Sequence, residues 1–168
     1  MNEKKILIAC LGNRLRKDDG LGSYVAERLL RMPLPSNVAV IDYGTAGFKL
    51  FHDLMDYDVV IFVDAIHGSG EAGSIVKFEV SECDIKDANP KDSSELFYLS
   101  YHEIDIESVL ALSKTIGKPP SKVIVIGMIP EDTGHGLGLS EPLARNFMKL
   151  INKILDEIWN IIGEVRNR

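Results

Sequence analysis

The sequence predicts an α/β sandwich built around a mostly parallel sheet. Three stretches, 5–12, 58–65 and 121–129, are short and apolar without alternation, which is typical of strands buried on both faces. Between them lie segments whose apolar residues recur at helical spacing. Since strands and helices alternate along the chain, we expect parallel strands with helices covering the sheet.

Each expected element has its own signal. The strand 5–12 is closed by a glycine, and the helix 20–32 carries Val25, Leu29 and Leu30 on one face before Pro33 ends it. The later elements are expected in this order: strand 37–44, helix 48–56, strand 58–65, strand 74–81, a polar irregular segment 82–97, helix 104–117, strand 121–129 and helix 141–163.

Two of these later elements have features that place them in the fold. Residues 74–81 alternate between apolar and polar, so this strand is expected at an edge or in an antiparallel pair. The helix 141–163 carries a long apolar stripe at helical spacing, which predicts a face packed on the core.

Length and composition fit one domain over residues 1–168. The chain is 45% hydrophobic, which is enough for a sizeable core, and its net charge of −6 argues against a nucleic-acid partner. No stretch is long enough to span a membrane. The two cysteines, Cys10 and Cys83, lack metal-ligand spacing and are interpreted as free thiols in a reducing compartment. We therefore expect a cytoplasmic monomer without a membrane partner.

Acidic residues gather where the predicted strands end. The carboxyl ends of parallel strands share one edge of a sheet, and ligands bind at that edge. Like charges converge only when a cation or protons compensate them, and a metal is the simplest solution. The acids that follow or end the strands are Asp18, Asp19, Asp42, Asp64, Glu131 and Asp132.

Structural roles compete with this interpretation. Asp18 or Asp19 would also suit the cap of a helix that begins at Gly20. Asp42 opens the turn-like stretch DYGTAG. Asp64 is harder to explain structurally, because a carboxylate that ends a buried strand needs a partner.

One histidine has a setting that favours metal binding. His102 lies in SYHEID, where Ser100 and Glu103 form a capping box and place the histidine in the first turn of a helix. The helix dipole there lowers imidazole basicity and favours the neutral, metal-binding ring.

Several familiar motifs are missing from the sequence. It has no dinucleotide fingerprint, no phosphate-binding loop, no nucleophile elbow and no H-E-x-x-H, so no organic cofactor is expected. A receiver-type signalling domain also places acids after its first and third strands around Mg²⁺, but it needs a lysine after the last strand. Here VIVIGMIPED (123–132) supplies acids instead.

The motifs taken together resemble the nickel–iron hydrogenase maturation endopeptidases. GNRLRKDDGLG (12–22) is similar to the family's G-N-x-L-x-x-D-[DE]-G-x-G opening. The stretches DYGTAG (42–47), VDAI (63–66), SYHEIDIESVLAL (100–112) and IGMIPE (126–131) follow in the family's order.

The resemblance implies a three-layer α/β/α sandwich around a mixed, mostly parallel sheet of about five strands. It implies an endopeptidase that removes the C-terminal extension of the hydrogenase large-subunit precursor after nickel insertion. Asp19, Asp64 and His102 would be the metal-binding and catalytic triad, with the nickel carried by the precursor. Asp42, Gly44 and Thr45 would take part in cleavage or nickel sensing, and Asp18 is left as a cap or turn residue.

Several alternatives stay open at this point. Either the metal activates the peptide or water, or one carboxylate acts as the general base. The chain would otherwise be a non-proteolytic chaperone for the precursor, or a receiver-type domain. The basic run Arg14, Arg16 and Lys17 would meet an acidic patch on the precursor or form a solvated loop, of which the loop is preferred.

Overall fold

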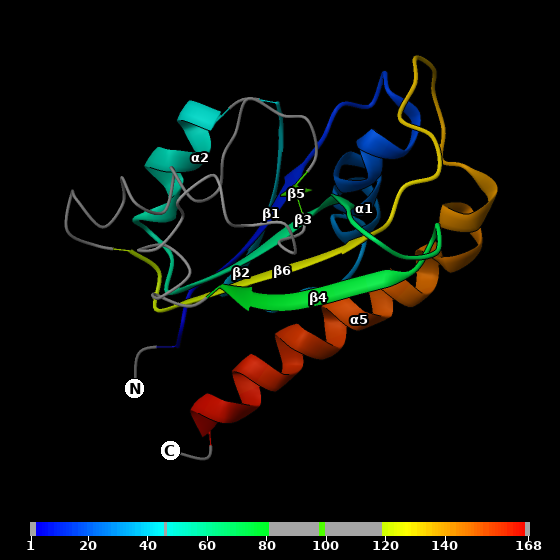
Figure 1. The fold of residues 1–168 in the computed structure, drawn as a ribbon. Helices are drawn as coiled ribbons and strands as arrows, with labels where there is room; N and C mark the ends of the chain where they lie inside the picture. The colour runs from blue at the N-terminus through cyan, green and yellow to red at the C-terminus, as the bar shows by residue number, and fades with distance from the viewer. Residues whose placement is uncertain (1–2, 46, 81–97, 100–118, 167–168) are drawn as a thin grey trace.

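The structure, a computed structural model, describes residues 3–45, 47–80, 98–99 and 119–166 (Figure 1). Its strands are β1 (Ile6–Leu11), β2 (Val38–Gly44), β3 (Val59–His67), β4 (Ile75–Val80), β5 (Tyr98–Leu99) and β6 (Lys122–Met128). Its helices are the 3-10 turn η1 (Lys17–Gly20), α1 (Leu21–Leu29), α2 (Gly47–Leu54) and α5 (Glu141–Arg166). None of these helices is long and apolar enough to cross a membrane.

The main sheet has the strand order β2-β1-β3-β6-β4. The pairs β1–β2, β1–β3 and β3–β6 are parallel, while β4 pairs antiparallel with β6 at the edge. The alternating pattern of residues 74–81 therefore predicted the position of β4 correctly. The short β5 pairs antiparallel with the end of β3, beyond the part of β3 that pairs with β1.

Helices cover both faces of this sheet. This is required because successive residues of β1 point to opposite faces and all of them are buried. Ile6, Ile8 and Cys10 face a core shared with α1 and α5, whereas Leu7 and Leu11 face a second core shared with α2. In Figure 1, α2 and α5 lie on opposite sides of the strands. The predicted three-layer α/β/α sandwich with a mostly parallel sheet is confirmed.

The order of connections reverses at β1. The chain leaves β1 through α1 to reach β2, and then returns through α2 to β3 on the other side of β1. Right-handed crossovers in opposite directions place these helices on opposite faces, as observed. Ligands of open α/β sheets bind outside the carboxyl ends of the strands, at the point where the strand order reverses.

The element bounds differ little from those predicted. The helix expected over 20–32 is α1, preceded by η1, and the strand expected over 58–65 continues to His67 as β3. The irregular segment expected over 82–97 and the whole helix expected over 104–117 lie outside the described residues.

Candidate functional site

The loop after β1 is held in a tight shape by Gly12. Its φ of 134° is one that residues with side chains rarely adopt, and a Cβ there would lie 2.0 Å from the carbonyl oxygen of Asp19. The backbone N–H of Asn13 donates to that same carbonyl oxygen at 3.0 Å. The start of the loop therefore contacts its end and fixes the backbone of Asp19.

Gly22 brings α1 close to the sheet just after Asp19. A Cβ at Gly22 would lie 2.0 Å from the carbonyl oxygen of Leu11 in β1 and 2.8 Å from that of Val63 in β3. No larger residue fits there, so the first turn of α1 rests directly on both strands. This contact places η1, which carries Asp19, against β3.

Asp64 lies in β3, one residue past the last position that pairs with β1. Its Oδ1 accepts a hydrogen bond from the backbone N–H of Ala65 at 2.7 Å. On the other side Asp64 is paired with Gly127 of β6, where a Cβ would lie 2.0 Å from the Asp64 carbonyl oxygen. A glycine inside an apolar strand signals such a close approach, and the sequence interpretation did not use it.

Asp19 and Asp64 are two buried carboxylates at one edge of the sheet. Their exposed fractions are 2% and 1%, and they come from packed elements, η1 and β3. Buried carboxylates in such a setting favour a bound cation. The structure thus places two of the three residues predicted for the metal-binding triad on elements that contact each other.

The third predicted member, His102, lies outside the described residues. In the ranges that are described, no cluster of three His, Cys, Asp or Glu residues is placed to hold a metal ion. Oxygen donors from Asp19 and Asp64 with an imidazole would suit a divalent ion such as nickel and leave positions open.

Asp42 also lies near the carboxyl ends of the strands, but it is exposed to solvent. It sits in β2, at the edge of the sheet, and its Oδ1 accepts a hydrogen bond from the N–H of Gly44 at 2.9 Å. Gly44 has a φ of 55° and accepts a hydrogen bond from the N–H of Gly12. Asp42, Gly44 and the exposed Thr45 therefore form a turn that is tied to the loop of Asp19.

Cys10 lies in the core between these acids. Burial raises the pKa of its thiol, and the carboxylates of Asp42 and Asp64 raise it further. The thiol is therefore protonated at neutral pH and is not a nucleophile.

Asp18 has a different role from the helix cap or turn that was predicted. Neither η1 nor α1 has a side-chain hydrogen bond at its N-cap. The buried Asp18 carboxylate instead accepts hydrogen bonds from the backbone N–H groups of Glu131, Asp132 and Ser140, and from the Ser140 hydroxyl. The capping interpretation is wrong because these partners lie more than a hundred residues away along the chain.

The remaining acids after β6 do not join the buried pair. The side chain of Glu131 is exposed, and Asp132 pairs with Lys17, which holds the pKa of the Asp132 carboxyl below its usual value. These acids shape the loop and supply no further buried carboxylate.

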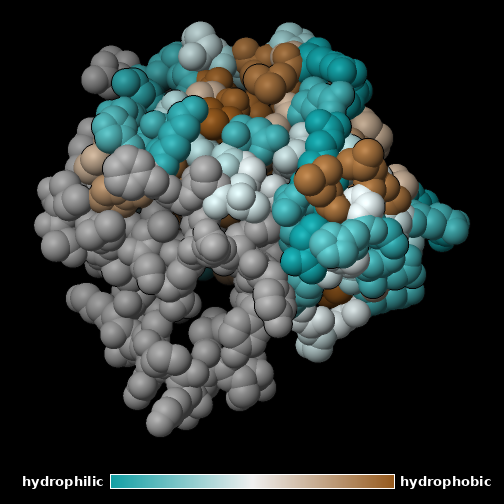
Figure 2. Space-filling view, turned by 90° about the horizontal axis from the view of Figure 1, so that it is seen from above, coloured by the Kyte–Doolittle hydropathy of each residue, from teal (hydrophilic) through white to brown (hydrophobic). Residues whose placement is uncertain are grey.

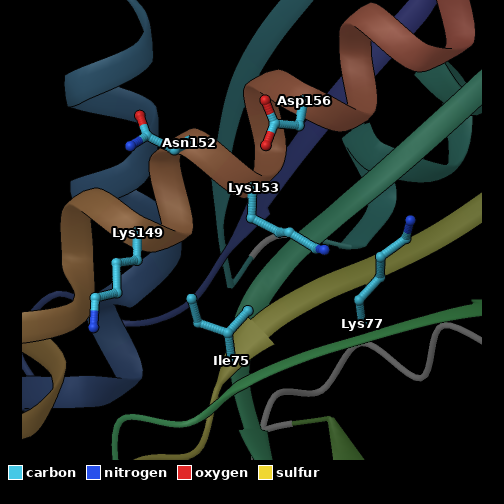
Figure 3. Close-up of a pocket in the computed structure, with 6 residues that line it drawn as sticks. All are labelled: Ile75, Lys77, Lys149, Asn152, Lys153 and Asp156. Atoms are coloured by element: carbon cyan, nitrogen blue, oxygen red, sulfur yellow. The ribbon is translucent and has the colours of Figure 1, made fainter.

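A separate hollow lies between β4 and α5 and is lined by Ile75, Lys77, Lys149, Asn152, Lys153 and Asp156 (Figure 3). Lys77 there is paired with Glu157. None of the predicted site residues lines this hollow, so the carboxyl end of the sheet, where Asp19 and Asp64 lie, is the stronger candidate.

Comparisons with known proteins show which family shares this fold. The sequence model of the hydrogenase maturation protease family matches residues 23–157. The hydrogenase 2 maturation protease of Escherichia coli is 28% identical, over 90% of this chain and 88% of its own length. The coenzyme F420 hydrogenase subunit delta of Methanothermobacter thermautotrophicus is 33% identical, over 93% and 96%.

A solved structure supports the same relationship. The hydrogenase maturating endopeptidase of Escherichia coli aligns with a TM-score of 0.78 at 26% identity, covering 93% of each chain. These matches confirm the family resemblance, the fold class and the peptidase class that the motifs predicted.

Proposed function

We propose that this chain, which belongs to the hydrogenase maturation protease family, removes the C-terminal extension of a nickel–iron hydrogenase large-subunit precursor after nickel insertion. The observation that carries the proposal is that two buried carboxylates, Asp19 and Asp64, lie on contacting elements at the carboxyl end of the sheet. This pair lies where open α/β sheets bind ligands.

We propose His102 as the third member of the site, and the position of β5 supports this. Leu99 of β5 pairs with Ile66, two residues after Asp64. His102 follows Leu99 by three residues, and three extended residues span at most about 11 Å. The length of chain thus allows His102 to approach the two carboxylates.

In this proposal the nickel belongs to the substrate. Asp19, Asp64 and His102 bind it, and so they orient the precursor and make cleavage depend on nickel loading. Burial of the two carboxylates strengthens their attraction for a cation, because the surrounding protein screens charge less than water does. Either carboxylate would also be placed to accept a proton from the attacking water.

The experiment that tests the triad is cleavage of nickel-loaded precursor, followed by mass spectrometry of its C-terminus. We expect His102→Ala to lower the rate at least about 100-fold, the usual effect of removing a group that acts in the transition state. His52→Ala is the matched control, since His52 is exposed on α2. Normal processing by a folded His102→Ala variant would show that His102 is not a member of the site.

Nickel recognition needs its own test. Precursor without nickel should remain uncut under conditions in which loaded precursor is processed. Equal cleavage of both forms would show that nickel is not recognised, while leaving the peptidase activity in place.

A non-proteolytic role is the second candidate. It is favoured by the relative from Methanothermobacter thermautotrophicus, which is named as a hydrogenase subunit rather than as a protease. Binding of loaded precursor with no loss of mass at its C-terminus would support this role. Loss of a C-terminal peptide would exclude it.

A further inference from the structure

Two leucines are strongly exposed on the loops that surround the candidate site. Leu15 is 66% exposed and Leu137 is 73% exposed. Leu15 lies four residues before Asp19, and Leu137 lies in the loop between β6 and α5. We call this pair the leucine ridge. Figure 2, which looks onto the molecule from the side where these loops rise in Figure 1, shows hydrophobic residues exposed among hydrophilic ones.

The backbone beneath the leucine ridge is firmly held. The N–H of Gly136 donates to the carbonyl oxygen of Leu15 at 2.9 Å, and the N–H of Lys17 donates to the carbonyl oxygen of Gly136 at 2.9 Å. The guanidinium Nε of Arg16 donates to the carbonyl oxygen of Thr133 at 3.1 Å. The two loops therefore present their leucines from a fixed frame instead of folding them inward.

The charges around the leucine ridge are largely matched within the chain. Arg14 pairs with Glu27 and stacks on the ring of Tyr24, and Lys17 pairs with Asp132. Two of the three basic residues of this loop are therefore paired with acids of the chain, and Arg16 donates to a backbone carbonyl oxygen. What Leu15 and Leu137 add to these loops is exposed apolar surface.

We propose that the leucine ridge is a docking surface for apolar side chains of the precursor, next to the segment that is cleaved. This inference rests on the proposed function and names a contact for it. Leu15 and Asp19 lie on the same loop, and the loop of Leu137 is hydrogen-bonded both to Leu15 and to Asp18, so the ridge adjoins the candidate site. Burying two exposed leucines on a partner strengthens binding without acting on the reacting bond.

The test is a matched set of single substitutions in the full chain. Leu15→Ser and Leu137→Ser should each raise KM for nickel-loaded precursor about tenfold, with kcat changed less than about twofold. Leu30→Ser is the control, because Leu30 is 65% exposed but follows the last turn of α1, at the far end from the site. It should leave KM unchanged.

A binding measurement separates this proposal from the proposed function. The same substitutions are placed in an Asp64→Asn background, and the Kd for loaded precursor is measured by calorimetry. Weaker binding with both ridge variants supports the docking surface even if the unmodified chain fails to cleave. Unchanged Kd and KM would overturn it, and so would an equal effect of Leu30→Ser. A dimer in sedimentation that Leu15→Ser dissociates would overturn it too, by assigning the ridge to a second copy of this chain.

Discussion

The carboxylate of Asp18 accepts two hydrogen bonds from Ser140, one from its backbone N–H at 2.7 Å and one from its hydroxyl at 2.8 Å. Ser140 precedes α5, and its own carbonyl oxygen accepts the N–H of Ala144. The residue beside Asp19 is thus bound to the beginning of the last helix.

Asp18→Asn should destabilise the fold by about 2–4 kcal/mol. An amide brings N–H groups toward four donors and loses the charge that strengthens these bonds. Ser140→Ala should cost about 1 kcal/mol, since the backbone donors remain. Urea unfolding measures both values. Equal stability of Asp18→Asn and the unmodified chain would contradict the role given to Asp18.

Two glycine-to-alanine substitutions should have opposite effects. Gly22→Ala should cost several kcal/mol or prevent folding, because its Cβ would lie 2.0 Å from a backbone oxygen. Gly163→Ala in α5 meets nothing within 4 Å and should add about 0.5–1 kcal/mol through helix propensity. Thermal unfolding of the two variants gives the comparison, and a stable Gly22→Ala protein would argue against the close contact of α1 with the strands.

Asp42→Ala should separate activity from stability. Asp42 is exposed and its carboxylate accepts one hydrogen bond within a turn, so the free energy of unfolding should change by about 1 kcal/mol or less. If Asp42 takes part in sensing nickel, processing of loaded precursor should fall while the fold persists. Cleavage at the rate of the unmodified chain would leave Asp42 as a turn residue only.

Stability should decline in alkaline solution because of Cys10. The pKa of its thiol is raised in the folded state by burial and by nearby carboxylates. Below the unfolded pKa of about 8.5, both states keep the proton and nothing changes. Above it only the unfolded state ionises, so the free energy of unfolding should fall by about 1.4 kcal/mol per pH unit from this group.

Cys10→Ala should remove this contribution. Urea unfolding at pH 7.5, 8.5 and 9.5 measures it, and this range stays below the usual pKa of tyrosine, about 10. Tyr43 and Tyr57, whose pKa values are also raised, then contribute little. The same slope in Cys10→Ala as in the unmodified chain would show that Cys10 is not its source.

The sheet could be predicted from sequence because its signals are local. Uninterrupted apolar runs indicated the buried strands β1, β3 and β6, and alternation indicated that β4 lies at an edge. The same reasoning placed Asp64 at the end of a buried strand; Asp64 is indeed buried in β3, but β3 continues past it to His67.

The roles of Asp18 and Asp19 could not be separated in this way. Both are buried neighbours in η1, and their difference depends on partners 113–122 residues away. Only the family resemblance singled out Asp19. The exposure of Asp42 was equally hidden, because it follows from the place of β2 at the edge of the sheet rather than from the turn itself.

The distance along the chain between Asp18 and its partners has a consequence during synthesis. A ribosome adds about 5–20 residues per second, so Ser140 emerges several seconds after Asp18. Until then the carboxylate of Asp18 lacks its hydrogen-bond donors from the loop after β6 and from Ser140. A chain that ends at β6 thus has Asp19 and Asp64, but it lacks the hydrogen bonds that join their neighbour Asp18 to the start of α5.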